Sequence, residues 1–385
     1  MKISVLLIPS QDYLRHPHPT RLHYIFENFD DAACVTVLNV RVRKGPARIR
    51  SKHEVIEVGS ASANLLQSYL MSYASFHVEL ARLLKRQKYD CIVLSHIISP
   101  LIPLLARRKC LVFDYKDVYS RSASAPFRAP MRWIVYWIAR LFEELLFRSR
   151  MAVVVPTPSM QALVRQRYGS DAVLITNGAN MELFRPLSIR ERRAARTKLG
   201  LRENDFCLCY LGSIEKWLDL ESVVLAIASI QQTRLVLIGG PVRSRAYMDQ
   251  ILHLCDKLQL KSRVIATGFR AQADAARIVS ACDAAIVPFR TDMELSLVAL
   301  PDKLFEYLGV GIPVISTRLP DVENMFGDLV HFYRGSSDLA EIIRDLLSRD
   351  VPWDHVARED LVAKYDWRHI SRRYQEFLAR LIVSN

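Results

Sequence analysis

The strongest signal for the fold is the stretch Ala299-Leu-Pro-Asp-Lys-Leu-Phe-Glu-Tyr-Leu-Gly-Val-Gly-Ile-Pro-Val-Ile-Ser-Thr317. A loop that carries Pro301 leads into a helix, and Gly309 and Gly311 end that helix. A buried strand, Val314–Ser316, follows at once. A helix joined by a short turn to a continuous apolar strand is typical of a parallel sheet whose faces are covered by helices.

The same helix offers a place for an anionic group. Its N-terminus carries free N–H groups and a partial positive charge, which suit a diphosphate. Lys303 in the first turn adds a full charge, and Glu306 can accept hydrogen bonds from ribose hydroxyls. Taken alone, these residues fit equally well a capped helix with a surface lysine and a surface glutamate, so both interpretations stay open.

The rest of the chain repeats this rhythm of short apolar strands and longer helices, once in each half. In the first half the predicted strands are Ile3–Ile8, Cys34–Leu38, Val55–Val58, Cys91–Leu94, Cys110–Phe113, Ala152–Val155 and Val173–Ile175. In the second half they are Phe206–Leu211, Arg234–Ile238, Val264–Ala266, Ala284–Val287, Val314–Ser316 and Val330–Phe332. The fold class is therefore α/β, with two doubly wound, Rossmann-like parallel-sheet domains that face a cleft.

We predict that residues 1–187 form an N-terminal acceptor domain and residues 188–366 a C-terminal donor domain. The arginine-rich segment Ser188–Arg202 is the predicted linker between them. Residues 367–385 carry apolar side chains at helical spacing, so we expect a terminal helix that docks back across the junction.

The net charge of +13 lies almost entirely in the first half of the chain. Residues 1–185 hold 26 lysines and arginines against 14 aspartates and glutamates, a balance of +12, whereas residues 186–385 hold 27 against 26. Such asymmetry suggests that the first domain meets a lipid head group, a phosphorylated acceptor or nucleic acid. The alternative is an arginine-rich surface that meets only water.

The cysteines and the apolar runs indicate the cellular compartment of the protein and its relation to membranes. Seven widely spaced cysteines, without metal-ligand spacing, fit a reducing cytoplasm. The opening run from Met1 to Pro9 fits a first strand rather than a signal peptide. No uncharged stretch makes a credible span of about 20 residues, so we expect any membrane contact to be peripheral.

Several motifs resemble GT-B glycosyltransferases of the large retaining family 4 type. The opening stretch resembles that family's donor signature in its Pro-Asn-Lys-Leu-Phe-Glu-Tyr variant, followed by Gly-x-Pro-Val. Other segments agree in the family's order: Val155-Pro-Thr-Pro-Ser-Met-Gln-Ala-Leu163, Ile175-Thr-Asn-Gly-Ala-Asn-Met-Glu-Leu-Phe-Arg-Pro186, Tyr210-Leu-Gly-Ser-Ile-Glu-Lys-Trp-Leu-Asp219, Leu237-Ile-Gly-Gly-Pro241, Ala266-Thr-Gly-Phe-Arg270, Cys282-Asp-Ala-Ala-Ile-Val-Pro-Phe289 and Tyr365-Asp-Trp367. The resemblance covers roughly residues 90–380, and the motifs are jointly more specific than any one of them.

The resemblance implies transfer of a sugar, with retention of anomeric configuration, from a UDP- or GDP-sugar to an acceptor hydroxyl. The acceptor would be a lipid-linked or cell-surface polysaccharide intermediate. Lys303 would contact the diphosphate, Glu306 the ribose, and Phe269 and Arg270 the base. The full set of implied donor residues is Gly212, Ser213, Lys216, Phe269, Arg270, Lys303, Leu304 and Glu306.

Three positions depart from the family pattern. Val298 stands where the family commonly has the first of two glutamates, the second being Glu306. Ser213 stands where an arginine often follows the glycine at the strand end, and Lys216 either compensates for it or is a solvated lysine. The first glycine of the chain is Gly45, so the usual early glycine-rich loop is missing.

The segment Leu111-Val-Phe-Asp-Tyr-Lys-Asp-Val-Tyr119 is the predicted catalytic segment. It resembles the family's Asp-x-His-Asp segment, with Lys116 where the histidine often stands. An attacking hydroxyl needs a base, and Asp117 and Asp114 are the candidates. For Asp117 the alternative is a buried carboxylate that caps the loop, and for Asp114 it is a structural role.

His16 and His18 follow the first strand, where an acceptor would lie, and are predicted acceptor contacts. A plain polar loop is the alternative. Their spacing matches no familiar metal site, and no paired-carboxylate motif is present, so we expect no metal cofactor. Lys303 and the helix N-terminus would instead stabilise the charge of the leaving nucleoside diphosphate.

Residues Met131–Phe147 form a predicted amphipathic helix with two tryptophans on its apolar face. It is either a core helix of the first domain or a helix that lies on an anionic bilayer. The basic run Arg41–Lys52 and the +12 balance favour peripheral association with the inner face of the membrane.

Three other functions stay open. A GT-B sugar-nucleotide 2-epimerase would share the architecture but would turn over without an acceptor. A catalytically silent GT-B scaffold would explain why Val298 stands where the family commonly has its first glutamate. A nucleic-acid-binding protein would explain the charge, although no nucleic-acid fold signature is present. The motifs favour the transferase, with a nucleotide sugar, a glycolipid acceptor and an anionic membrane as partners and without nucleic acid.

Overall fold

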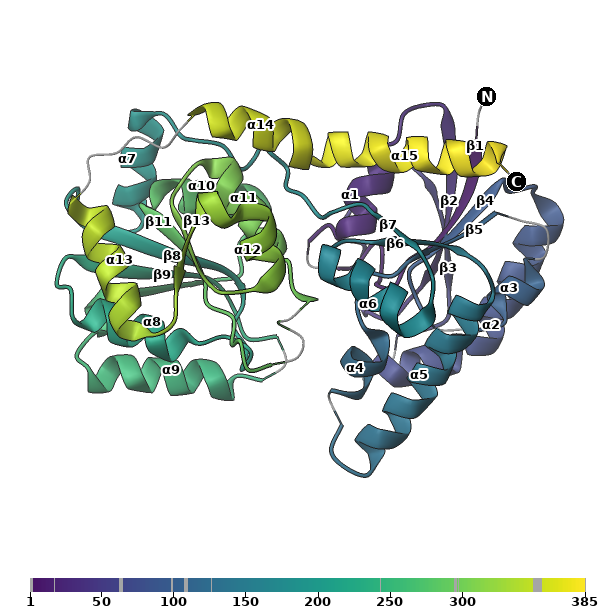
Figure 1. The fold of residues 1–385 in the computed structure, drawn as a ribbon, viewed down its shortest axis with the longest axis horizontal. Coiled ribbons are helices and arrows are strands. Elements are labelled where there is room, and N and C mark those ends of the chain that lie inside the picture. The colour runs from purple at the N-terminus through teal and green to yellow at the C-terminus, as the bar shows by residue number, and fades with distance from the viewer. Residues whose placement is uncertain are drawn as a thin grey trace. The chain divides into compact units, whose positions relative to one another are not determined.

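The structure is a computed structural model that describes residues 3–16, 18–61, 65–97, 100–106, 110–125, 127–242, 244–293, 296, 298–348 and 355–384. The chain divides into two compact units (Figure 1). Unit 1 comprises Met1–Thr176 and Trp367–Asn385, and unit 2 comprises Asn177–Asp366. Each unit is a parallel sheet with helices packed on it, which confirms the predicted fold class of two Rossmann-like domains.

The sheet of unit 1 has the strand order β3-β2-β1-β4-β5-β6-β7 and every pairing is parallel. Its strands are β1 (Ile3–Ile8), β2 (Ala33–Val40), β3 (Glu54–Val58), β4 (Cys91–Leu94), β5 (Cys110–Asp114), β6 (Ala152–Val155) and β7 (Ala172–Leu174). The helices are α1 (Arg21–Glu27), α2 (Leu65–Arg86), α3 (Ile102–Leu105), α4 (Tyr119–Ser124), α5 (Met131–Arg148), α6 (Pro158–Tyr168) and α15 (Trp367–Val383).

The sheet of unit 2 has the order β10-β9-β8-β11-β12-β13 and is also parallel. Its strands are β8 (Phe206–Ser213), β9 (Thr233–Gly240), β10 (Val264–Gly268), β11 (Ala284–Val287), β12 (Val314–Thr317) and β13 (Val330–Tyr333). Its helices are α7 (Ile189–Lys198), α8 (Leu220–Ala228), α9 (Ala246–Lys257), α10 (Gln272–Ala281), α11 (Asp302–Val310), α12 (Pro320–Phe326), α13 (Ser336–Ser348) and α14 (His355–Tyr365), with 3₁₀ turns η1 (Lys261–Arg263) and η3 (Gly327–Leu329).

The two strand orders share one feature that places ligands. In unit 1 the chain winds outward in opposite directions from β1 and β4, and in unit 2 from β8 and β11. In open α/β sheets, ligands bind beyond the carboxyl ends of the strands at such a switch point. The carboxyl ends of these four strands are therefore where functional residues of each unit are expected.

The division between the units falls between Thr176 and Asn177, earlier than the predicted boundary at 187–188. The reason is packing, because Met181 and Phe184 are buried in the core of unit 2. A Cβ atom on Gly309 of α11 would lie 2.5 Å from Met181 Sδ, so this segment lies directly against the helix. Residues 177–187 are thus part of unit 2.

The segment Ser188–Arg202 is not a linker. Ser188 and Glu191 form a capping box at the start of α7. The buried Arg196 donates hydrogen bonds to Asp283 Oδ2 at 3.1 Å and to the Asp205 carbonyl at 2.5 Å. The arginines of this segment therefore fix a helix onto the unit 2 core, whereas sequence composition alone suggested a solvated connection.

The terminal helix α15 packs on α1 within unit 1. The Trp367 ring stacks on Tyr24 with centroids 5.1 Å apart and an interplanar angle of 3°. Ser371 Oγ donates to the Ile25 carbonyl at 2.5 Å. Among the described residues, no helix combines the length and the apolarity that a bilayer crossing requires.

Candidate functional site

The switch point of unit 2 is lined by glycines. β8 ends in Gly212-Ser213 and β9 in Gly239-Gly240, paired in register. Gly212 has φ +130° and Gly239 has φ +133°, a backbone region that side chains rarely adopt. A Cβ atom on Gly239 would lie 2.0 Å from the Gly212 carbonyl oxygen. Only glycine fits there, and its bare backbone leaves room for a ligand to approach closely.

Lys303 extends from the first turn of α11 toward this edge. Its Nζ lies 5.2 Å from the centroid of the Tyr210 ring, on β8, and 5.1 Å from that of the Phe289 ring, just beyond β11. A Cβ on Gly212 would lie 3.2 Å from Lys303 Cε. The ammonium group therefore lies between the ends of the two switch-point strands, held by cation–π contacts. Burial lowers the pKa of Lys303.

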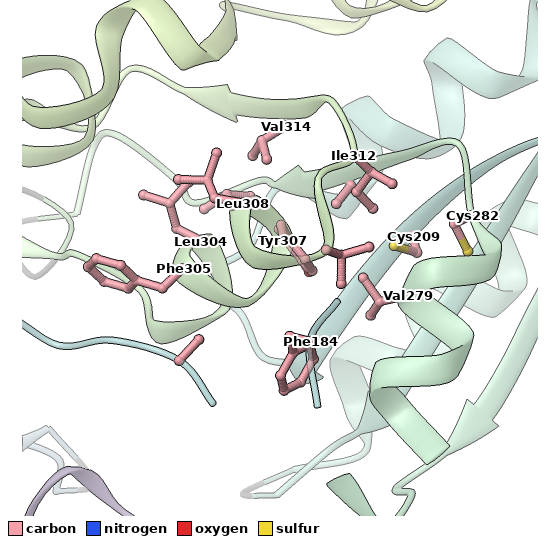
Figure 2. Close-up of a cluster of buried hydrophobic side chains, with 14 of the residues drawn as sticks. Phe184, Cys209, Val279, Cys282, Leu304, Phe305, Tyr307, Leu308, Ile312 and Val314 are labelled. Carbon is pink, nitrogen blue, oxygen red and sulfur yellow. The ribbon is translucent and has the colours of Figure 1, made fainter. Parts of the chain in front are cut away.

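The helix α11 is fixed by its buried face. Figure 2 shows Leu304, Phe305, Tyr307 and Leu308 directed into the apolar cluster of unit 2. Tyr307 Oη accepts a hydrogen bond of 2.7 Å from the Leu211 backbone N–H, which ties the helix to β8. Gly311, with φ +79°, ends α11 in the left-handed conformation, whereas Gly309, also predicted to end the helix, lies inside it.

The N-terminus of α11 carries no side-chain cap. Pro301 precedes the helix in an extended conformation and accepts no capping bond through its side chain. The Leu304 N–H donates to the Pro301 carbonyl at 3.0 Å, and Asp302 and Lys303 form the first turn of the helix. A helix terminus of this kind carries partial positive charge next to the Lys303 ammonium.

Glu306 lies one turn after Lys303 on the same helix. Burial raises the pKa of its carboxyl group to about 8, with a smaller contribution from the nearby Asp302. The opposite charge of Lys303 acts in the other direction. A carboxyl group that holds a proton near neutral pH can donate a hydrogen bond as well as accept one, which suits contact with sugar hydroxyls.

The other predicted donor residues separate into two groups. Ser213 lies at the end of β8, where its carbonyl accepts a 2.7 Å hydrogen bond from Tyr210 Oη. The exposed Phe269 ring lies 3.5 Å from the place of a Cβ on Gly240, so it borders the same edge. Lys216 is exposed in the following loop.

Leu304 and Arg270 have other surroundings. The Leu304 side chain is fully buried, so it fixes α11 to the apolar core of unit 2. Arg270 lines a cavity of about 380 Å³ between α7 and α10, together with Glu191 and Arg277.

The switch point of unit 1 is lined by side chains. The strands β1, β4 and β5 are followed by Pro9-Ser10, Ser95-His96 and Tyr115-Lys116. The Ser95 N–H donates to the Ile8 carbonyl at 3.0 Å, and Tyr119 Oη donates to the Ser95 carbonyl at 2.6 Å. Burial, with the charge of Lys116 nearby, lowers the pKa of His96 to about 4. His96 is therefore a neutral imidazole at the switch point.

Sequence analysis did not single out His96. The signal that could have found it is its position, because it comes directly after the continuous apolar strand of residues 91–94 and one serine. Its neighbours are Lys116, beyond the end of β5, and Tyr119, at the start of α4, which lie about 20 residues later in the chain. Only the strand order, with β1 beside β4, reveals that His96 lies at the switch point.

The two predicted catalytic aspartates have different surroundings. Asp114, at the end of β5, is fully buried, and Arg21 Nε lies 3.3 Å from its Oδ1. Arg21 also donates to the carbonyls of Ile175 and Thr176 at 2.7 and 2.8 Å. Asp114 thus joins α1, β5 and the end of β7, which is the structural role left open by the sequence.

Asp117 is half-buried in the turn before α4. Burial raises its pKa, although a hydrogen bond with Ser122 and the charge of Lys116 act against that rise. A carboxylate with a raised pKa is a stronger base than a solvated one. Its position beyond β5, near Lys116, is compatible with contact to an acceptor hydroxyl.

The two predicted acceptor histidines differ in exposure. His16 Nδ1 lies 2.7 Å from the His18 carbonyl, so it donates there as the Nδ1–H tautomer. Burial lowers the pKa of His16 to about 4, and charges on Arg43 and Lys116 act in the same direction. His18 is exposed. The influence of Lys116 on both His16 and His96 indicates that the three side chains belong to one edge of unit 1.

The structure offers no obvious metal centre in the part of the chain that it describes. Within those residues, no three His, Cys, Asp or Glu side chains gather in a way that could hold an ion. The expectation of a metal-free enzyme stays a prediction.

Sequence models of two families match the two halves of the chain. The model of "Glycosyltransferase Family 4" matches residues 33–183, and that of "Glycosyl transferases group 1" matches residues 191–360. A curated relative, the D-inositol 3-phosphate glycosyltransferase of Mycobacterium marinum, is 31% identical over 143 residues. That alignment covers 37% of this chain and 29% of the relative, so the match spans less than a third of the relative's length.

Solved structures share the fold at low sequence identity. The sucrose-phosphate synthase of Thermosynechococcus elongatus aligns with a TM-score of 0.77 at 18% identity, over 100% of both chains. Anabaena Alr3699/HepE, in complex with UDP and glucose, aligns with a TM-score of 0.73 at 18% identity, over 97% of this chain and 99% of that one. Two family models in the order of the two sheets, and neighbours of this architecture over the whole length, show that the chain belongs to the family 4, or group 1, glycosyltransferases of GT-B fold.

Proposed function

We propose that this protein transfers a sugar from a nucleoside-diphosphate sugar, UDP- or GDP-linked, to a hydroxyl group of an acceptor bound by unit 1. The observation that carries the proposal is the Lys303 ammonium at the glycine-lined switch point, beside the N-terminus of α11. A diphosphate is the ligand that such a combination of cation, helix N-terminus and open backbone favours. Family membership, and the solved neighbour that holds UDP and glucose, support this choice.

In this proposal each donor residue has one task. Lys303 and the first N–H groups of α11 bind the diphosphate oxygens. Glu306 binds ribose hydroxyls, and the exposed Phe269 ring offers a flat apolar surface to the base. Gly212 and Gly239 supply backbone without side chains, so that the diphosphate reaches the strand ends.

The chemical step needs a base for the acceptor and a cation for the leaving group. The acceptor oxygen forms a bond to the anomeric carbon as the bond from that carbon to the diphosphate oxygen breaks. The hydroxyl proton passes to a carboxylate, for which we propose Asp117, and the charge left on the nucleoside diphosphate is stabilised by Lys303. No step in this scheme requires a metal ion.

The acceptor in this proposal is a lipid-linked intermediate of polysaccharide biosynthesis, and the enzyme works in the cytoplasm on the inner face of a membrane. The +12 balance of residues 1–185 supports an anionic acceptor or surface for unit 1. The curated glycosyltransferases that match this chain are named for a phosphorylated acceptor, D-inositol 3-phosphate.

Nucleotide binding tests the donor site directly. We would measure thermal stabilisation by UDP, GDP, ADP and CMP for the wild type, Lys303→Ala and Lys257→Ala, an exposed lysine on α9. A nucleotide at about a hundred times its dissociation constant stabilises the folded state by roughly 2.7 kcal/mol. We expect stabilisation by UDP or GDP that Lys303→Ala loses and Lys257→Ala keeps.

Two outcomes would contradict the proposal. Equal stabilisation of all three proteins would place the nucleotide elsewhere, and no stabilisation by any nucleotide would favour a silent scaffold. Incubation of the matching nucleotide sugar without acceptor separates transfer from epimerisation, because only an epimerase converts its substrate alone.

A further inference from the structure

The helix α5 exposes a continuous apolar face. Seven large apolar side chains on it are between 42% and 62% exposed. We call them the α5 stripe: Met131, Trp133, Ile134, Trp137, Ile138, Leu141 and Leu145. At 100° per residue these seven positions fall within one half of the helix circumference, so they lie on one side of the helix. A contiguous apolar patch of this kind on a folded protein marks a surface that meets a partner or a membrane.

The opposite face of α5 is already engaged. Glu143 is fully buried and accepts hydrogen bonds from Tyr115 Oη at 2.9 Å, the Ser120 N–H at 3.0 Å and Tyr168 Oη at 3.0 Å. If α5 rolled to bury the stripe, it would leave this carboxylate without partners, which is strongly unfavourable. The stripe is therefore held outward by the packing of the helix, and the interpretation of α5 as a pure core helix is wrong.

The start of α5 lies at the functional edge of unit 1. The chain leaves the carboxyl end of β5, forms α4 and then α5, and returns to the amino end of β6. In Figure 1 the first half of α5 extends beyond the sheet of unit 1. That edge also carries His96 and Asp117, so the stripe begins on the side of unit 1 where we place the acceptor.

The charge around the first part of the stripe, up to Ile138, is positive. The segment from Tyr119 to Ile138 contains Arg121, Arg128 and Arg132 and no acidic residue. The exposed basic loop 41–52 follows the carboxyl end of β2 and so lies at the same edge. Arg15 Nε donates to the Gly45 carbonyl at 2.9 Å, which fixes this loop to the rest of unit 1.

We propose that the α5 stripe docks into the interface of an anionic bilayer, with the arginines around it and the basic loop 41–52 against lipid head groups. The proposal rests on the proposed function only in that a lipid-linked acceptor would be reached from the same surface. Tryptophan favours the boundary between head groups and acyl chains, and basic side chains beside it add electrostatic attraction. A second copy of the chain is disfavoured as occupant, because pairing two stripes would bring like-charged arginines together.

Vesicle binding by the full chain tests the proposal. We would measure co-sedimentation with phosphatidylcholine vesicles that contain or lack phosphatidylglycerol, for the wild type and for the double variant W133S/W137S. We expect binding that requires phosphatidylglycerol, weakens as salt rises, and falls at least about tenfold in the double variant, because two interfacial anchors are removed. Blue-shifted tryptophan emission on adding vesicles, reduced in W133F/W137F, would place these two side chains in the interface.

A matched pair of leucine variants controls for general loss of apolar surface. Leu141→Ser removes a side chain of the stripe that is 54% exposed, and Leu225→Ser removes one that is 46% exposed on α8 of unit 2. We expect weaker vesicle binding only for Leu141→Ser. Circular dichroism melting of each variant reports whether it folds.

Three results would overturn the proposal. The first is a wild-type protein that does not bind vesicles and is monomeric. The second is a dimer in sedimentation velocity that W133S/W137S abolishes, in which case the stripe is an interface between copies. The third is vesicle binding that is equal with and without the stripe. Because vesicle binding needs no donor, its failure is separable from loss of nucleotide binding at Lys303.

Discussion

The two units share a sheet topology but end their central strands in different ways. In unit 2, β8 and β9 end in glycines whose positive φ angles and mutual approach exclude side chains. In unit 1, β1, β4 and β5 end beside Ser10, His96 and Lys116, and the Tyr119 hydroxyl closes over the backbone of Ser95. The switch point of unit 2 thus offers bare backbone beside the Lys303 ammonium, and that of unit 1 offers polar side chains.

This difference teaches how one architecture can serve two kinds of ligand. A diphosphate is bound well by backbone N–H groups and fixed dipoles, which need close approach and therefore glycine. A hydroxyl that must lose a proton needs a side chain with a suitable pKa, which glycine cannot supply. The neutral His96 and the raised pKa of Asp117 fit the second task, and the half-buried Lys303 fits the first.

The largest expected effects come from the two aspartates of unit 1. Asp117→Asn should lower kcat/KM by about 10²–10⁴-fold with nucleotide binding unchanged, because only the proposed base is lost. Asp114→Asn should instead lower the free energy of unfolding by about 3–5 kcal/mol, because Arg21 is left buried without its charged partner. Steady-state kinetics and urea unfolding of both variants check this separation of roles. If Asp117→Asn transferred sugar normally, the chemistry would have to be assigned elsewhere on unit 1.

The close approach of Gly212 and Gly239 at the ends of β8 and β9 can be disrupted by a substitution that changes no charged residue. Gly239→Ala would place a Cβ 2.0 Å from the Gly212 carbonyl oxygen, so we expect a loss of about 3 kcal/mol or more in the free energy of unfolding, together with loss of nucleotide binding. Gly169→Ala is the control, because it also has positive φ but meets nothing within 4 Å. That variant should cost only about 1 kcal/mol. Comparable losses in urea titrations of the two variants would show that close approach at the strand ends is unimportant.

The unit 2 site was predictable from sequence because its signals are local. Gly212 and Ser213 end an apolar run, and Lys303 and Glu306 occur one helical turn apart within one motif. The structure places Gly212 and Ser213 at the end of β8, Lys303 in the first turn of α11, and Glu306 one turn later. Leu304 shares the motif, but helical periodicity turns its side chain into the core.

The unit 1 site was less predictable because its partners are distant in sequence. Arg21 and Asp114 are 93 residues apart, so nothing local in the sequence distinguishes Asp114 from Asp117. The same limit applies to α7. The sequence shows that this segment is rich in arginine, but it does not show that Arg196 donates hydrogen bonds to Asp283 and to the Asp205 carbonyl. Alternation of strands and helices fixes the architecture, whereas long-range pairing decides which charged residues are structural.

The pH dependence of stability tests the polar environment of α11. Because the pKa of Glu306 is about 8 in the folded state and 4.5 in the reference state, the folded protein binds the extra proton between these values. Its contribution to stability is therefore fully present below about pH 4.5 and is lost as pH rises through about 8. We expect Glu306→Gln to remove about 2 kcal/mol of this decline, allowing for partial exposure of the side chain. Urea unfolding at pH 5 and pH 8.5 measures it, and identical pH slopes for the two proteins would contradict the assignment.

The smallest expected effect concerns the loop that follows β8. Ser213, the last residue of β8, occupies a position that often carries an arginine in the family that the sequence resembles. Lys216 is exposed nearby, and its backbone carbonyl accepts a 3.1 Å hydrogen bond from Arg290 Nε, which holds the backbone of the loop. If its ammonium compensates for the missing arginine, Lys216→Ala should weaken nucleotide binding by about threefold to fivefold, as expected of an exposed charge pair worth under about 1 kcal/mol. The loss should shrink as salt rises, because the charge is solvent-exposed, whereas the loss in Lys303→Ala should persist. Isothermal titration at low and high salt distinguishes the two lysines. An unchanged affinity in Lys216→Ala at low salt would mean that unit 2 binds its diphosphate with Lys303 and backbone alone, which would widen the contrast with the side-chain-lined edge of unit 1.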